Sequence, residues 1–430
     1  MIQNKILACA IAASLTASCS VLADRDHSGD HHPRAFKFKP ITESAYNATW
    51  NSAAPWVIPE GFTQTVVSDE SDLNIYDGGR DDWNDMNTVN ETGKQAGRFL
   101  YRTHEVRIGS EYTEGGAVSV VDLKTGAARV IAQDITWTAL DGITWTPWGT
   151  VLFAEENTNG RLMELILDEH DRMSGVANER PAVGLLAHEG IQVDQDGTVY
   201  VVDEFRGQTL GYGGGIYKFV PDNYGDLTSG KLYVLKVTGD DGVGTGEWVG
   251  PIDPSNARQS GTDFGGTSYQ RPEDLQIIGN TLYVAVTEGT DYSGRVLAIN
   301  LWDMNVSNYV KPGVNAPVED KVNKITGFAK VDNLAVTADG KLVMIEDNIP
   351  SDIWVATEAH DHDGVAEAIE LFASLTDPEA EGTGIYFGKD PNTLFVNVQH
   401  SAATDGDGTW AITKTKSAHA HKKHKHGHDE

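Results

Sequence analysis

One pattern of polar and apolar positions recurs along the chain: an acidic residue, a short apolar run, a turn, a second apolar run, and a further acidic residue or pair. Clear copies occupy residues 140–156, 188–204, 272–288 and 331–347, and a variant that begins at glycine occupies residues 384–400. A weaker copy begins near Asp85 and ends at Glu105. Short alternating runs predict β-strands, and the repetition of one hairpin-sized unit predicts a repeat architecture.

The geometry of a hairpin decides where these acids lie. The start of the first strand and the end of the second lie at the same end of an antiparallel pair, so each unit brings its acids to one edge. If the units are blades with the first strand innermost, these edges meet at the mouth of a β-propeller channel. We therefore expect an all-β fold: a single β-propeller, with six blades as the best fit and five to seven compatible with the spacing.

A ring of carboxylates at a channel mouth predicts bound metal, because like charges in a partly desolvated site raise one another's pKa. Carboxylate oxygens without thiolates favour calcium, in several copies. Within each adjacent acidic pair only one side chain faces the channel, since successive strand residues point to opposite faces. The candidate metal ligands are Glu105, Glu155, Glu156, Glu189, Glu204, Glu273, Asp274, Asp332, Glu346 and Asp347.

The ends of the chain differ from the repeats in composition. Residues 1–23 are typical of a Sec-type signal peptide, with Lys5 before an apolar run and small residues at the cleavage point. The expected location is periplasmic or secreted, and lipid attachment at Cys19 is the less favoured alternative. Residues 24–45 and the His- and Lys-rich residues 414–430 are predicted to be disordered, leaving residues 46–413 for the propeller domain.

Charge narrows the choice of partners. The net charge of −30 argues against nucleic acid, which requires a basic surface. Beyond the leader, no segment is long and apolar enough to cross a membrane. We expect a monomer that binds a small molecule. The Gly- and Asp-rich residues 239–269 form a long insertion, which predicts a lid over the channel mouth.

Several segments then identify a family resemblance. The chain resembles the PhoX-type bacterial alkaline phosphatases from about residue 85 to 402. The resemblance rests on these motifs: Thr103-His-Glu105, residues 146–157 (TPWGTVLFAEEN), His188-Glu189, Arg271-Pro-Glu-Asp-Leu275, Asp332-Asn-Leu-Ala335 and residues 394–400 (LFVNVQH). The family is a β-propeller that holds calcium ions and an iron pair at the channel mouth and hydrolyses phosphate monoesters.

Two departures from the family pattern argue against iron. Ala154 stands where the family has an iron-ligating cysteine, and the leader lacks the twin arginines typical of the family. Both departures indicate a site that takes up its metal, calcium, after the protein has been exported. The resemblance then implies an exported calcium-dependent phosphatase in which Arg271 binds the phosphate, while His400 or His104 serves the leaving group or binds metal.

Two other functions remain open at this point. A calcium-dependent propeller hydrolase could act on lactones or phosphodiesters. A non-catalytic calcium-binding propeller could serve as a scaffold or adhesion module, which the missing cysteine makes more credible. The sequence lacks a Gly-x-Ser-x-Gly elbow, a His-Glu-x-x-His motif and a dinucleotide fingerprint, so acyl-enzyme, zinc-protease and nicotinamide chemistry lose support.

Overall fold

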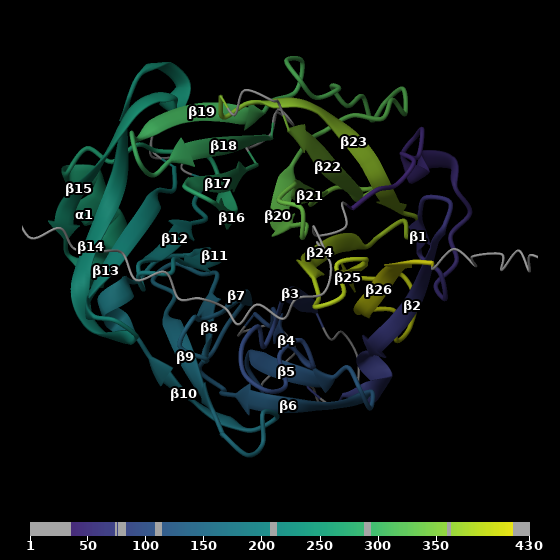
Figure 1. The fold of residues 1–430 in the computed structure, drawn as a ribbon, viewed down its shortest axis with the longest axis horizontal. Helices are drawn as coiled ribbons and strands as arrows, with labels where there is room; N and C mark the ends of the chain where they lie inside the picture. Colours follow the sequence, from purple (N-terminus) through teal and green to yellow (C-terminus); the bar gives the residue numbers. More distant parts are fainter. Residues whose placement is uncertain are drawn as a thin grey trace, which may run out of the picture. The chain divides into compact units, whose positions relative to one another are not determined.

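Six β-strands form the innermost layer of the fold, and each contacts the next in a closed ring (Figure 1). In order around the ring they are β3, β7, β11, β16, β20 and β24. Each is the inner edge strand of an antiparallel sheet that runs outward, and β11 and β16 are the two edges of one nine-stranded sheet. The arrangement is a β-propeller, as predicted. This computed structural model describes residues 36–73, 75, 83–107, 114–206, 213–287, 294–358 and 363–415, all within one contact unit, Ala35–Glu430.

The first three blades follow one another along the chain. The first contains β3 (Asn84–Val89), β4 (Phe99–His104), β5 (Ala117–Asp122) and β6 (Ala127–Gln133). The second contains β7 (Leu140–Trp145), β8 (Val151–Glu155), β9 (Leu162–Leu167) and β10 (Gly175–Glu179). The third contains β11 (His188–Val193), β12 (Val199–Asp203), β13 (Ile216–Asn223), β14 (Asp226–Thr238) and β15 (Gly244–Ile252).

The last three blades complete the ring. The fourth contains β16 (Pro272–Ile278), β17 (Thr281–Val286), β18 (Arg295–Asn300) and β19 (Asn305–Val310). The fifth contains β20 (Val331–Val336), β21 (Leu342–Glu346), β22 (Asp352–Glu358), β23 (Ala366–Leu375) and the short β1 (Trp56–Val57). The sixth contains β24 (Glu381–Phe387), β25 (Thr393–Gln399), β26 (Gly408–Lys414) and β2 (Phe62–Asp69).

The N-terminal strands close the ring. β2 pairs with β26, so the sixth blade joins segments from both ends of the described chain, and β1 pairs with β23. Phe36 is only 2% exposed and packs against Phe372 in the core of these blades. Ordered packing therefore begins before residue 46, within the segment that was expected to be disordered.

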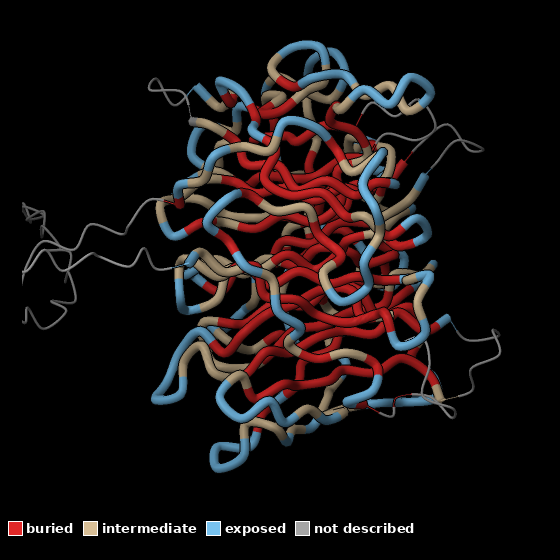
Figure 2. Tube along the Cα trace, turned by 90° about the vertical axis from the view of Figure 1, so that its right-hand side faces the viewer, coloured by how far each residue is buried: buried red, intermediate tan, exposed pale blue. Residues whose placement is uncertain are grey.

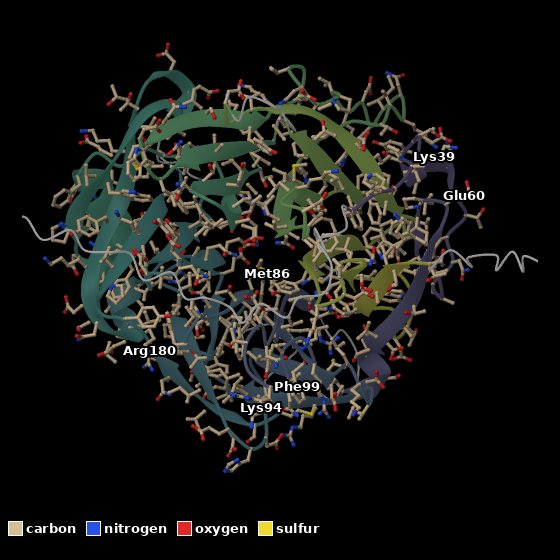
Figure 3. All side chains as sticks on the ribbon, viewed as in Figure 1. Lys39, Glu60, Met86, Lys94, Phe99 and Arg180 are labelled. Atoms are coloured by element: carbon tan, nitrogen blue, oxygen red, sulfur yellow. The ribbon has the colours of Figure 1, made fainter. Side chains whose placement is uncertain are left out.

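The core lies between the blades. Strands near the axis are buried on both faces, and accordingly β8 reads as a continuous apolar run up to its final Glu155. At the periphery, β6 and β10 contain only intermediate and exposed positions. Figure 2 shows the buried strands stacked through the interior, with exposed segments mainly in the loops. In Figure 3, Met86 on β3 lies near the centre of the ring, whereas Arg180 and Glu60 lie toward its periphery.

The insertion at residues 239–269 is not a lid over the channel mouth, and that expectation is corrected. It contains η4 (Asp240–Gly242), β15, η5 (Pro254–Asn256) and α1 (Ala257–Asp263). β15 pairs with β14 on one side and with β19 on the other, which joins the third and fourth blades in one nine-stranded sheet. The insertion lies at the outer rim, where its backbone covers the outer edges of two blades. The other 3₁₀ turns are η1 (Ala45–Asn47), η2 (Glu70–Asp72) and η3 (Pro181–Val183).

Some expectations concern residues that the structure does not describe. They are the signal peptide with Cys19, the polar residues 24–35, Glu288 at the end of its repeat, and the tail beyond residue 415. Within the described ranges, none of the helices has the length and apolar character needed to cross a bilayer.

Candidate metal centre and active site

A cavity of about 470 Å³ lies where the innermost strands begin and the second strands end. Most of its wall is charged. The lining residues are Trp83, Asp85, Glu105, Arg107, Asp141, Glu156, Glu189, Glu204, Arg206, Arg271, Asp332, Asp347, Glu381, Thr383, Gln399 and His400. The repeats therefore bring their acids to one place, as the hairpin geometry predicts.

The first tier of acids comes from the second residue of five innermost strands. These residues are Asp85, Asp141, Glu189, Glu273 and Asp332, and each is at most 9% exposed. In all five strands the pairing register shifts at this acid, which marks a β-bulge. A bulge bends a strand and re-aims its side chains, so the same local irregularity recurs around the ring where the acids meet.

Glycine after the acid permits close approach of neighbouring blades. A Cβ at Gly142 would lie 1.8 Å from the backbone oxygen of Glu189, and one at Gly190 would lie 2.6 Å from the Cα of Asp274. Such distances exclude any side chain without movement of the strands. The Asp-Gly and Glu-Gly dipeptides of the second and third repeats are therefore needed for the tight ring that brings the acids together.

The second tier comes from the ends of the second strands, where adjacent acids separate into two roles. Glu156, Glu204 and Asp347 line the cavity. The residue before each one bonds to the loop that precedes its own blade: Glu155 accepts from the Thr138 backbone N–H at 3.0 Å, Asp203 from Ala187 at 2.9 Å and Glu346 from Ala329 at 2.8 Å. In each pair it is the second residue that faces the cavity.

Arginines lie between these acids. Arg271 Nε lies 3.0 Å from Glu273 Oε1 and also contacts Glu204, while its Nη1 lies 3.4 Å from Asp347. Arg107 contacts Glu105 and lies 2.7 Å from Glu156. These guanidinium groups offset part of the negative charge and present donors to an anion.

Two groups of acids have donor oxygens close enough to share a metal ion. Asp141, Glu156 and Glu189 form one group, and Glu189, Glu273 and Asp332 form the other, with all donors of a group within 4.8 Å of one another. Glu189 belongs to both. In addition, the buried Oδ1 of Asp141 has no hydrogen-bond partner. Buried carboxylate oxygens without partners fit a hard cation such as calcium or magnesium.

Burial and mutual repulsion raise the pKa values of most of these acids. Burial, followed by repulsion from Glu105, raises the pKa of Asp85 to about 7. Burial is the main cause that raises the pKa of Glu273 to about 8. The same cause raises the pKa values of these further acids: Glu105, Asp141, Glu156, Glu189, Asp332 and Glu381. Near neutral pH the cluster therefore holds either protons or cations.

His400 lies at the edge of this cluster. Its Nε2 lies 3.7 Å from Glu381 Oε1, and its ring packs edge-on against Trp83 at 5.1 Å between centroids. Its side chain is 41% exposed, so it is accessible from the cavity. His104 instead lies buried in β4, with its Nε2 2.7 Å from Ser119 Oγ.

Five predicted site residues are not part of the cavity lining. One of them, Glu273, contacts the lining residue Arg271 at 3.0 Å, and the other four bond elsewhere. His104 bonds Ser119, and Glu155 bonds Arg161 at 2.6 Å. Asp274 accepts from the Leu334 backbone N–H at 2.8 Å, which links the fourth blade to the fifth. Glu346 accepts from Trp354 Nε1 at 3.0 Å. Ala154, the expected cysteine position, is fully buried in an apolar cluster between blades and is not part of the lining.

Sequence reasoning did not assign five charged residues of the cavity: Asp85, Arg107, Asp141, Arg206 and Glu381. Asp85 and Asp141 mark the starts of repeats, so the repeat phase could have found them. The two arginines follow an acid by two residues in different blades, as Glu105-Val-Arg107 and Glu204-Phe-Arg206. Glu381 precedes the glycine start of its repeat and gave no signal in the pattern.

Comparisons with known proteins place the fold and the family. The solved structure of Pseudomonas fluorescens PhoX in complex with vanadate, a transition state analogue, aligns with a TM-score of 0.62 at 17% identity, covering 88% of this chain and 98% of that chain. Virginiamycin B lyase from Staphylococcus aureus aligns with a TM-score of 0.43 at 14% identity, covering 82% and 99%. The PQQ-bound aldose sugar dehydrogenase from Streptomyces coelicolor aligns with a TM-score of 0.45 at 15% identity, covering 83% and 99%.

A search of curated proteins found no match. The sequence profile described as alkaline phosphatase PhoX matches residues 167–402, which is more than half of the chain and includes Glu189, Arg271 and Asp332. The chain belongs to the PhoX family of alkaline phosphatases.

Proposed function

We propose that the protein is an exported, calcium-dependent phosphatase that hydrolyses small phosphate monoesters in the central cavity. The observation that carries this proposal is the convergence of two acidic groups, joined by Glu189, beside the guanidinium of Arg271, whose side chain is only 14% exposed. Acids alone would repel a phosphate. With cations held by the acids, the same wall becomes an anion site, and Arg271 can then bind the phosphoryl oxygens.

The cations would be held by Asp141, Glu156 and Glu189 in one group and by Glu189, Glu273 and Asp332 in the other. When bound, they would supply positive charge toward the phosphoryl oxygens and toward the attacking water. We favour calcium because all the donors are oxygens and calcium tolerates irregular coordination, whereas magnesium requires a near-octahedral arrangement. The position of Ala154 within the apolar core offers no ligand for iron.

The residues of the chain then have separate tasks. Arg271 is held by Glu204, Glu273 and Asp347, so its guanidinium is oriented before the substrate enters. Arg107 is more exposed, at 55% of its side chain, and can reach the outer part of the ester. His400 lies near the open edge of the cluster, where it can donate a proton to the departing alcohol.

The first test is an assay of the purified chain on p-nitrophenyl phosphate, with added calcium, with chelator, and with calcium plus iron. We expect activity that chelator removes and calcium alone restores. Glu189→Gln should abolish most activity because Glu189 belongs to both acidic groups. Glu367→Gln is the matched control, since Glu367 is exposed on β23. No turnover of monoesters under any metal condition would contradict the proposal, and lactone or diester turnover would favour the alternative hydrolase.

A further inference from the structure

A second cavity, of about 570 Å³, lies at the opposite end of the propeller channel. The first cavity lies where the innermost strands begin, whereas the second is lined by later residues of the same strands and by several of the turns that follow them. All six innermost strands contribute to its wall. A volume between about 300 and 1,000 Å³ is typical of sites that bind small organic molecules.

The part of the wall that comes from the strands is largely apolar. Each innermost strand contributes one large apolar side chain to the lining: Met86, Ile143, Ile191, Ile277, Leu334 and Ile385. Met86 is labelled near the centre of the ring in Figure 3. Contact with such a wall removes apolar surface from water, so it favours a ligand with an apolar portion.

The charged side chains in the lining of the second cavity are all acidic. They are Glu91, Asp194 and Asp274, and none of the described lining residues is a lysine, an arginine or a histidine. Both carboxylate oxygens of Asp274 accept backbone N–H groups, from Leu275 at 2.6 Å and from Leu334 at 2.8 Å. Glu91 and Asp194 lie in the turns after β3 and β11. Without the arginines of the first cavity, the second cavity repels anions and attracts cations.

The lining also holds a buried acceptor that has no hydrogen-bond partner among the described residues. It is Oδ1 of Asn87, a residue that is only 4% exposed. The amide Nδ2 of Asn87 donates to the backbone oxygen of Gly384 at 2.6 Å and to Asn397 Oδ1 at 2.9 Å, which fixes the orientation of the amide. Buried polar atoms are nearly always paired in folded proteins, so this acceptor indicates a ligand that donates a hydrogen bond.

We propose that the second cavity binds a small aliphatic amine in its protonated form. An ammonium group carries positive charge and three donors but no acceptor, which matches the carboxylates of Glu91 and Asp194 and the free oxygen of Asn87. The alkyl chain would lie against the apolar wall. A phosphate or carboxylate ligand would meet only like charge there. This site is separate from the metal-binding acids and does not rest on the proposed phosphatase function.

The main test compares three molecules that have the same alkyl chain and different charge. Hexylamine, which is protonated at pH 7, 1-hexanol and hexanoate are each titrated into the full chain by calorimetry, with calcium present to occupy the acids of the first cavity. We expect saturable binding of hexylamine, with a Kd about tenfold lower than that of 1-hexanol, and no binding of hexanoate. Equal affinities for hexylamine and 1-hexanol, or no saturable binding of hexylamine, would overturn the proposal.

A double variant tests the two acids directly. Glu91→Gln with Asp194→Asn should weaken hexylamine binding about tenfold and leave the affinity for 1-hexanol unchanged. The matched control is Asp196→Asn with Asp390→Asn. It removes the same number of charges from exposed turns at the same end of the propeller, outside the lining. Each control aspartate accepts a backbone N–H through an oxygen that asparagine retains. Equal weakening in both double variants would reduce the effect to general attraction and contradict the site.

A further variant separates the two cavities. Glu189→Gln disrupts both acidic groups of the first cavity and should leave hexylamine binding unchanged. A loss of hexylamine binding in Glu189→Gln would place the amine in the first cavity instead. Because the three molecules are compared on the wild-type chain, that comparison still decides the question if the double variant does not fold.

Discussion

Glu155 and Glu156 are adjacent at the end of β8, but their carboxylates have opposite surroundings. Glu155 is bound by the Thr138 backbone N–H and by Arg161, whereas Glu156 lines the cavity within reach of Asp141 and Glu189. The same division recurs at Asp203 and Glu204 and at Glu346 and Asp347. One acid of each pair holds the blade together, and the other contributes to the cavity.

This division predicts opposite effects of two neighbouring substitutions. Glu155→Ala should destabilise the protein by about 3 kcal/mol, since it leaves Arg161 and a backbone donor without their partner. Its calcium affinity should stay near that of wild type. Glu156→Gln should instead weaken calcium binding and activity, while the free energy of unfolding in chelator stays the same or rises.

Urea unfolding with chelator and calcium titration of each variant check this prediction. A Glu156→Gln variant with normal calcium binding would contradict the assignment of the second acid to the cavity. Thr138 bonds Glu155 through its backbone, so its side chain can be changed as a control. Thr138→Ser should leave both unfolding and calcium binding unchanged.

The raised pKa values predict how metal-free stability depends on pH. The pKa of Asp85 is about 7 and that of Glu273 about 8 in the folded protein, against ordinary values of 3.8 and 4.5. Between pH 4 and pH 8 the folded state therefore binds more protons than the unfolded state, so stability falls as pH rises through this window. Calcium should remove this loss because it stabilises the ionised carboxylates.

Thermal unfolding at pH 5 and pH 8.5, with calcium or with chelator, tests the sign of this dependence of stability on pH. We expect the Tm in chelator to be lower at pH 8.5 and the calcium-induced rise to be larger there. Glu273→Gln should flatten the dependence in chelator, since one titrating group is removed. A chelated protein that is as stable at pH 8.5 as at pH 5 would show that these acids do not titrate as described.

Phosphatase activity should require the planar guanidinium group of Arg271 and not only its positive charge. Lysine would keep the charge but lose the planar pair of donors that binds a phosphoryl group, so Arg271→Lys should lower kcat/KM by about 10²-fold. Inhibition by inorganic phosphate should weaken in parallel, because the same contact binds product. Arg161→Lys is the control: Arg161 also pairs with a buried glutamate, but outside the cavity. An equal loss of kcat/KM in Arg271→Lys and Arg161→Lys would indicate that both substitutions act only through the structure.

The sequence predicted the ring and its acidic mouth, because hairpin geometry alone places the two ends of each repeat together. It did not determine which acid of a pair enters the cavity, since this depends on the backbone as it leaves the strand. Glu155 still pairs within β8, and Glu156 lies one residue beyond. Asp274 shows a second limit, because a bulge between Pro272 and Leu275 aims Glu273 toward the acidic groups and Asp274 toward the fifth blade.

The insertion at residues 239–269 shows a third limit. Its Gly- and Asp-rich composition predicted a surface loop but not the edge that it covers. Pairing of β15 with both β14 and β19 is a long-range contact that depends on the positions of two blades. Likewise, Arg258 on α1 binds Asp203 at 2.6 Å across 55 residues of sequence, and no local pattern predicts such a pair.

His400 is expected to protonate the leaving group, and this role has a specific kinetic signature. An alcohol with a high pKa needs a proton as it departs, whereas p-nitrophenolate does not. His400→Gln should therefore reduce kcat by about 10²-fold on an alkyl phosphate and much less on p-nitrophenyl phosphate. Glutamine keeps the size and polarity of the side chain but cannot transfer a proton. Rates measured over a series of leaving groups would give a steeper dependence on leaving-group pKa in the variant. A uniform loss over the series would instead assign His400 to substrate positioning beside Trp83 and Glu381.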